Sequence, residues 1–119
     1  MTKTLTFRTR ATTTGAVIEL TGELDHHTMA EVRAALSGIT LRTGQQLVLD
    51  LEALTFCDSS GISMLIAARN HALAAGATIA LAAVPARVAR VFRVVGLAQV
   101  FPTHPTAQDA EDAWHTASG

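Results

Sequence analysis

The sequence predicts a small α/β domain with a mixed β-sheet. After an opening pair of strand-like segments, short apolar runs alternate with segments of helical periodicity, as in residues 47–51 and 62–73. Alternating strand and helix units favour parallel strands joined by right-handed crossovers, whereas two strands joined by a short turn form an antiparallel hairpin. The length of 119 residues fits one domain, which we expect to span residues 1–119 with its core at about 5–115.

The first two predicted strands form the hairpin. Residues 4–10 alternate weakly between apolar and polar side chains, which indicates an edge strand. Residues 12–15 are a polar turn that ends in glycine, and residues 16–21 alternate again. The short turn predicts antiparallel pairing of these two strands.

A helix and a buried strand follow the hairpin. Thr28 is a predicted N-cap, with Glu31 three residues later completing a capping box, and Gly44 is the predicted end of the helix. Residues 47–51 are a short apolar run, typical of a central strand that is buried on both faces. Residues 53–56 are predicted to be an apolar connection.

The second half of the chain continues the alternation. A helix is predicted from the segment 58–61 to Gly76, and a strand is predicted at residues 78–82. Residues 100–101 are predicted to be a short strand and residues 106–116 a last helix.

The helix that begins near Pro85 and ends at Gly96 carries two stripes of side chains. We expect one stripe to face inward and the other to face solvent. The inner stripe comprises Val84, Val88, Val91, Phe92 and Val95, and the outer stripe comprises Arg87, Arg90 and Arg93.

Composition excludes several classes of protein. Hydrophobic residues make up 49% of the chain and charged residues 16%, which is incompatible with a disordered chain. A formal charge of -1 lacks the basic excess of a dedicated nucleic-acid binder. One cysteine cannot form an internal disulfide or a cysteine-based zinc site. No signal core and no apolar run of about 18 residues is present, so we expect a soluble cytoplasmic protein with no membrane partner.

The sequence contains only weak signs of catalysis or metal binding. Cys57 with His26 or His71 is a possible nucleophile pair, although an apolar setting favours a buried structural thiol. Adjacent His26 and His27 near Asp25 lack the helical spacing of metal ligands, so no metal and no cofactor is expected. A serine hydrolase needs a glycine before its nucleophile, whereas here Gly61 follows the serines.

Several segments together resemble the STAS-domain anti-sigma-factor antagonists of bacterial sporulation and stress responses. The resemblance is carried by residues 21–28 (TGELDHHT), 48–52 (VLDLE), 56–62 (FCDSSGI), 84–88 (VPARV) and 94–97 (VVGL). Motif, spacing and element order match across nearly the whole chain. The sequence departs from many relatives at Ile62-Ser63, where Leu-Gly is common.

The resemblance implies the STAS fold and a protein that is not an enzyme. It implies binding to an anti-sigma factor that is also a GHKL-type serine kinase, with release of the sigma factor. Phosphorylation of the first serine after the aspartate, here Ser59, would break the complex, and a serine phosphatase would restore it. The ATP or ADP would be bound by the kinase, and the antagonist would be a monomer or a weak dimer.

The same resemblance implies a partner-binding surface around Ser59. Its expected members are Glu23, Asp25, His26, Asp58, Ser59, Ser60 and Gly61. Ser59 would lie at the start of a helix, where amide groups and the helix dipole tolerate an anion. Two other roles stay open: a scaffold or accessory subunit of a stress-sensing complex or lipid transporter, and, more remotely, a small hydrolase.

Overall fold

The computed structural model describes residues 5–118, without the side chains of residues 115–118. It contains a five-stranded sheet in the order β1-β2-β3-β4-β5. The strands are β1 (Leu5–Thr12), β2 (Gly15–Leu24), β3 (Gln46–Cys57), β4 (Thr78–Ala82) and β5 (Thr103–His104). The helices are α1 (Met29–Ser37), α2 (Ser59–Ala74), α3 (Ala86–Val94) and α4 (Ala107–Ser118).

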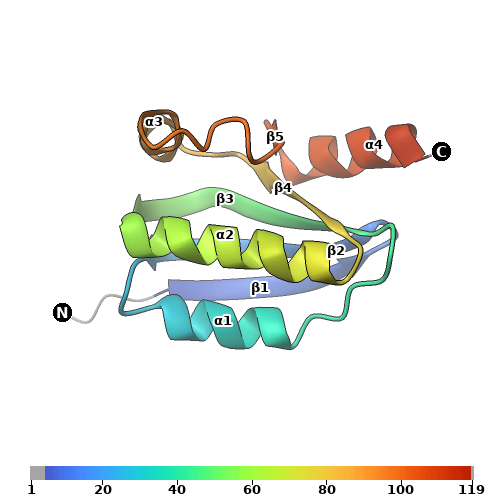
Figure 1. Ribbon diagram of the computed structural model, residues 1–119, viewed down its shortest axis with the longest axis horizontal. Helices are drawn as coiled ribbons and strands as arrows, with labels where there is room; N and C mark the ends of the chain where they lie inside the picture. The colour runs from blue at the N-terminus through green and yellow to red at the C-terminus, as the bar shows by residue number, and fades with distance from the viewer. Residues whose placement is uncertain (1–4, 119) are drawn as a thin grey trace.

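The predicted mixed sheet is confirmed. Strands β1 and β2 pair antiparallel, whereas β2, β3, β4 and β5 are parallel to their neighbours. Figure 1 shows α1 and α2 in front of the sheet, with α4 on the far side of β4 from them. Thr4, the first residue of the predicted opening strand, lies outside the described residues.

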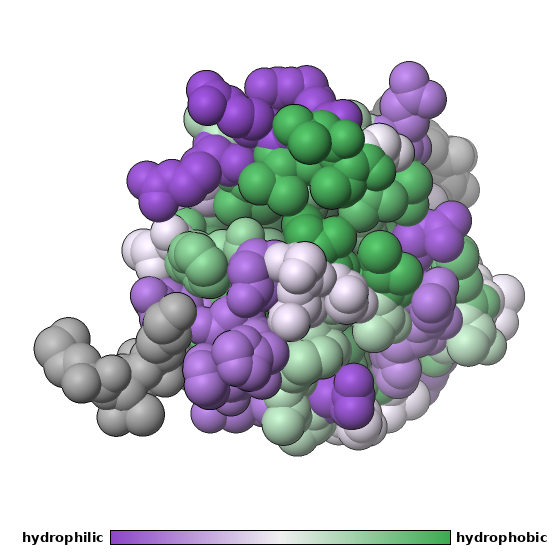
Figure 2. All heavy atoms as spheres, turned by 60° about the vertical axis from the view of Figure 1, so that its left-hand side comes forward, coloured by the Kyte–Doolittle hydropathy of each residue, from purple (hydrophilic) through white to green (hydrophobic). Residues whose placement is uncertain are grey.

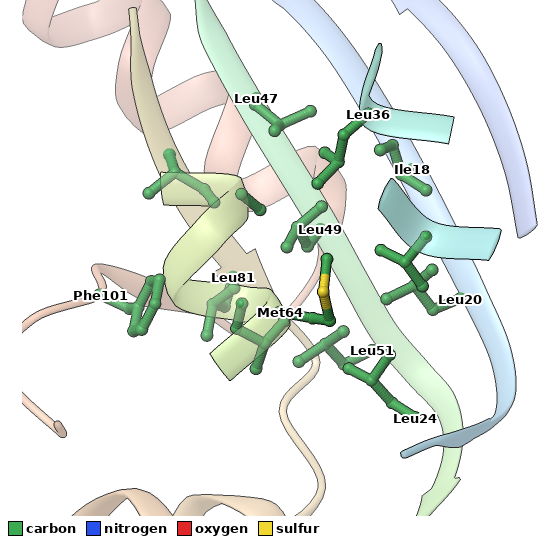
Figure 3. Packing of buried hydrophobic residues seen from close by; sticks show 14 of the residues in the cluster. Ile18, Leu20, Leu24, Leu36, Leu47, Leu49, Leu51, Met64, Leu81 and Phe101 are labelled. Carbon is green, nitrogen blue, oxygen red and sulfur yellow. The ribbon is translucent and has the colours of Figure 1, made fainter. Parts of the chain in front are cut away.

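The two faces of the sheet bury two separate clusters. Alternate residues of β3 divide between them, because successive side chains of a strand point to opposite faces. Leu47, Leu49 and Leu51 join the large cluster beneath α1, α2 and α3 (Figure 3). Val48 joins the small cluster beneath α4, where Ala107 and Ala110 are buried.

Strand β3 is longer than the sequence predicted. The register between β2 and β3 shifts after Glu19 and again after Gly22, so β3 contains one extra residue at each place. These bulges let the strand continue to Cys57, through residues 53–56, which the sequence predicted to be a connection. The extension carries β3 to the end of β2.

Helix α1 is shorter than predicted. It ends at Ser37 with Gly38 as its C-cap, and Gly44 instead lies in the turn that leads into β3. The amide of Gly44 donates to the carbonyl of Gly76 at 3.0 Å, which joins this turn to the end of α2. Residues 38–45 are therefore not helical and connect α1 to β3.

The predicted strand at residues 100–101 is wrong. Phe101 is 2% exposed and its ring lies 5.9 Å from that of Phe92, so it is a core residue at the edge of α3. The strand is formed by Thr103 and His104, which pair with Leu81 and Ala82. Pro102 lies just before it, and its carbonyl accepts from the amide of Leu81 at 2.9 Å.

Candidate functional site

Strands β2 and β3 end side by side, and we call this edge of the sheet the carboxyl edge. Leu24 pairs with Cys57, so the residues that follow the two strands are neighbours. The amide of Asp58 donates to the carbonyl of Leu24 at 3.3 Å. In Figure 1 this edge lies on the left, beside the start of α2. The structure therefore places the segment after β2 next to the segment that leads from β3 into α2.

Asp58 is the N-cap of α2. Its backbone is extended, with φ −99° and ψ −169°, and its carboxylate accepts a hydrogen bond from the amide of Gly61 at 3.0 Å. An aspartate in this position satisfies an amide that the helix itself leaves unpaired. Asp58 is half-buried, so its charge stays close to the surface at the helix start.

Ser59 is the first residue of α2 and is exposed, whereas Ser60 is half-buried. The backbone carbonyl of Ser59 accepts a hydrogen bond from the hydroxyl of Ser63 at 3.0 Å. An added anionic group here would lie at the positive end of the helix dipole. The start of α2 therefore presents an exposed serine where the helix dipole favours negative charge.

Gly61 lets α2 approach the ends of β2 and β3 closely. A Cβ atom at this position would collide with the carbonyl oxygen of Leu24 and would lie 2.8 Å from the sulfur of Cys57. Gly61 is itself buried in the first turn of α2. The absence of a side chain thus sets the distance between the helix start and the carboxyl edge.

Asp25 does not lie on the surface, and the prediction that it does is wrong. It is 1% exposed, and its Oδ1 accepts from the amides of His27 at 2.9 Å and Thr28 at 3.2 Å. A carboxylate has several acceptor sites and can hold a tight turn in this way. Asp25 therefore shapes the loop after β2 from inside.

The predicted capping box at Thr28 does not form. Thr28 is the N-cap of α1, but its side chain makes no cap hydrogen bond. Its hydroxyl donates to the carbonyl of Glu23 at 2.9 Å and accepts from the amide of Asp25 at 3.0 Å. Because the hydroxyl is committed to the loop, it is unavailable to the helix.

The other predicted members of the site lie at the rim of this loop. Glu23 is half-buried, and His26 and His27 are exposed with ring centroids 3.8 Å apart. Within residues 5–118, no group of three or more His, Cys, Asp or Glu side chains converges as metal ligands would. The loop therefore presents two exposed imidazoles, whose planes are tilted by 40° to each other.

Comparison with known proteins assigns the family. The family model for the STAS domain matches residues 6–110, which is most of the chain. The chain belongs to the STAS domain family. Two solved structures of SpoIIAA share the fold over almost their whole length.

Two solved structures and one curated relative show this likeness. The anti-sigma factor antagonist SpoIIAA in its unphosphorylated form is 27% identical and superposes with a TM-score of 0.76, covering 93% of this chain and 97% of that one. The phosphorylated form of the Bacillus cell fate determinant SpoIIAA is also 27% identical, with a TM-score of 0.68 over 91% and 98%.

The curated relative is the anti-sigma F factor antagonist of Lysinibacillus sphaericus. It is 40% identical over 67 residues, which are 55% of this chain. The match spans 57% of that relative's own length.

Among the described residues, the hydrogen bond of the Cys57 thiol is to the carbonyl of Asp58 and not to a histidine. No hydrogen bond joins a histidine to Cys57 or Ser59 in the described part of the chain, and His71 lies about 18 Å along α2 from Ser59 at 1.5 Å per residue. Burial and the neighbouring Asp58 charge raise the pKa of the Cys57 thiol to about 12. A protonated thiol is a poor nucleophile.

The described helices include none with the length and apolar character that a membrane span requires.

We expect Cys57 to react slowly with iodoacetamide. With its pKa raised from 9.0 to about 12, the thiolate fraction at pH 8 falls by about a thousandfold relative to an ordinary cysteine. Mass spectrometry over time at pH 8, with the urea-unfolded protein as reference, measures the rate. Equal alkylation rates of Cys57 in the folded and unfolded protein would contradict the raised pKa of its thiol.

The same pKa shift predicts a loss of stability in alkali. Between pH 9 and 12 the unfolded chain loses the Cys57 proton and the folded chain keeps it, so the free energy of unfolding falls as pH rises. Cys57→Ala should remove this component from the pH dependence of the urea midpoint.

Sequence reasoning missed the structural role of Leu24. Its side chain is fully buried, and its carbonyl accepts from Asp58 and limits the approach of Gly61. A leucine between two acidic residues at the end of a strand is the only local signal. The contact itself depends on the pairing of β2 with β3.

Proposed function

We propose that this STAS domain is an anti-sigma-factor antagonist that is switched off by phosphorylation at Ser59. In its unphosphorylated form it binds an anti-sigma factor with serine-kinase activity in the cytoplasm, and the sigma factor is released. The observation that carries the proposal is an exposed serine at the first position of a capped helix, directly beside the end of a neighbouring strand. The names of the relatives support the same function.

The switch acts through local charge. A phosphate adds about −1.5 to −2 charges at pH 7, which takes the formal charge of the chain from -1 to about −3. Asp58, which directly precedes Ser59, has a half-buried carboxylate. The charges of the phosphate would therefore lie beside another negative charge at one place on the surface. A partner surface packed against Ser59 then meets added bulk and negative charge together. The domain keeps its fold, and the affinity changes.

Phosphate transfer tests the proposal. We expect the host's anti-sigma factors, purified and supplied with Mg-ATP, to phosphorylate this chain, and the transferred group to be mapped to Ser59 by mass spectrometry. Ser59→Ala should abolish the transfer, and the matched change Ser63→Ala, one helical turn further along α2, should leave it intact. Treatment with a serine phosphatase should restore the original mass. Binding without phosphate transfer to Ser59 would contradict the switch.

A further inference from the structure

Helix α3 concentrates positive charge. Arg87, Arg90 and Arg93 lie on it, and it contains no acidic residue. In a chain of formal charge -1 this helix therefore carries +3, and the rest of the chain carries −4. Such segregation indicates a surface that meets an opposite charge.

These three arginines are exposed. No carboxylate lies within 4 Å of them among the described residues, where the ion pairs instead join Arg10 to Glu19 and Glu111. Arg87 makes one long contact, from its Nη1 to the carbonyl of Thr55 at 3.4 Å. The positive charge of α3 is therefore available to a partner.

An apolar patch adjoins the arginines. Val94 is 80% exposed and Val95 is 54% exposed, although the sequence predicted that Val95 faces inward. Val88 and Phe92 already hold the opposite face of α3 against the core. Figure 2, in which the left-hand side of Figure 1 comes forward, shows a hydrophobic patch bordered by hydrophilic atoms at the top, where Figure 1 places α3.

This helix lies close to the segment that leads to Ser59. The contact between Arg87 and Thr55 joins α3 to the end of β3, four residues before Ser59. A groove of about 640 Å³ separates the two elements. It is lined by Leu54, Thr55, Pro85, Ala86, Arg87, Val88 and Arg90. A partner that fills this groove would therefore contact both α3 and the end of β3, the strand that leads to Ser59.

We propose that α3 is a docking surface for an acidic segment of the anti-sigma factor that has an apolar centre. The surface comprises Arg87, Arg90, Arg93, Val94 and Val95, and the inference rests on the proposed function. Opposite charges would attract the acidic segment to the three arginines, while Val94 and Val95 would be buried at its apolar centre. A phosphate at Ser59 would repel this acidic segment, because both are negatively charged. The arginines thus strengthen binding of the unphosphorylated domain to the anti-sigma factor, and phosphorylation at Ser59 opposes that binding.

Charge reversal tests the surface. We expect Arg87→Glu, Arg90→Glu and Arg93→Glu together to weaken binding of the host's ADP-bound anti-sigma factor at least tenfold in 50 mM NaCl, measured by titration calorimetry. The loss should shrink in 300 mM NaCl, because salt screens exposed charges. The matched control is Arg8→Glu, Arg33→Glu and Arg42→Glu, which changes the net charge equally at exposed positions elsewhere. We expect it to stay within about twofold of the unchanged protein.

A second variant tests the apolar part. Val94→Ser should weaken binding roughly tenfold at both salt concentrations, because it removes burial and not charge. Circular dichroism shows whether each variant is folded. If the triple arginine variant is unfolded, the single change Arg90→Glu replaces it, with an expected threefold loss of affinity.

The outcomes separate the two proposals. Equal losses in the α3 variant and its control, or no loss in either, would overturn the docking surface while Ser59 phosphorylation stands. No binding and no phosphate transfer by the unchanged protein would overturn the proposed function, and the docking surface with it.

Discussion

Ser59→Asp is expected to weaken binding to the anti-sigma factor by about a hundredfold, which corresponds to about 2.7 kcal/mol. The substitution places a permanent negative charge at the first position of α2, directly after the Asp58 carboxylate. Because Ser59 is exposed and the helix start tolerates an anion, the domain should fold normally. The loss of affinity then arises in the complex, because binding of the partner must desolvate two adjacent negative charges.

Two comparisons make this result specific to the site. Asn70→Asp adds the same charge at an exposed position of α2, about 16 Å along the helix from Ser59, and should leave the affinity within about twofold. Ser59→Ala should bind as the unchanged protein does and should resist inactivation by ATP. Equal losses from Ser59→Asp and Asn70→Asp would show that net charge, and not position, controls binding.

Gly61→Ala should reduce the free energy of unfolding by about 1–3 kcal/mol, the usual cost of an overpacked core. The added methyl group would collide with the Leu24 carbonyl, which is backbone, and with the sulfur of Cys57. Alanine is the better helix former by about 1 kcal/mol, but this gain is smaller than the collision when the neighbouring atoms cannot move aside. Thermal unfolding should shift downward by roughly 5–10 °C for a domain of this size.

Gly38→Ala is the matched control for Gly61→Ala. Gly38 is the C-cap of α1 with a φ of −83°, and a Cβ atom there would lie 3.6 Å from the nearest atom, the carbonyl oxygen of Ala35. We expect its melting temperature to change by less than about 2 °C. A melting temperature for Gly61→Ala equal to that of Gly38→Ala would show that α2 can shift away from β2 at little cost.

Local pattern was sufficient for the order and type of most elements. The apolar run at residues 78–82 coincides with β4. Asp58 marks the start of α2, because a carboxylate just before a helix accepts a hydrogen bond from an amide of its first turn. The arginine stripe of α3 is exposed as its spacing predicts. In each case a signal within a few residues contains the whole physical reason.

Expectations failed where strand pairing, or a turn that the sequence pattern does not reveal, decides what a residue contacts. β3 extends through two bulges because β2 lies beside it, and Thr28 serves the loop after β2 instead of α1. Asp25 looked like a surface acid, yet it is buried and accepts amides from its own turn. Nothing in the local pattern tells a surface carboxylate from one that a turn encloses.

The amino-acid order therefore contains the serine, its capping aspartate and the helix that follows them, since capping is a local interaction. The pairing of β2 with β3, which places Leu24 against Gly61, arises only when residues more than 30 positions apart meet. The position of α3 beside the end of β3 depends in the same way on the packed core. Side-chain chemistry follows from sequence, whereas its grouping into one surface follows from strand pairing and burial.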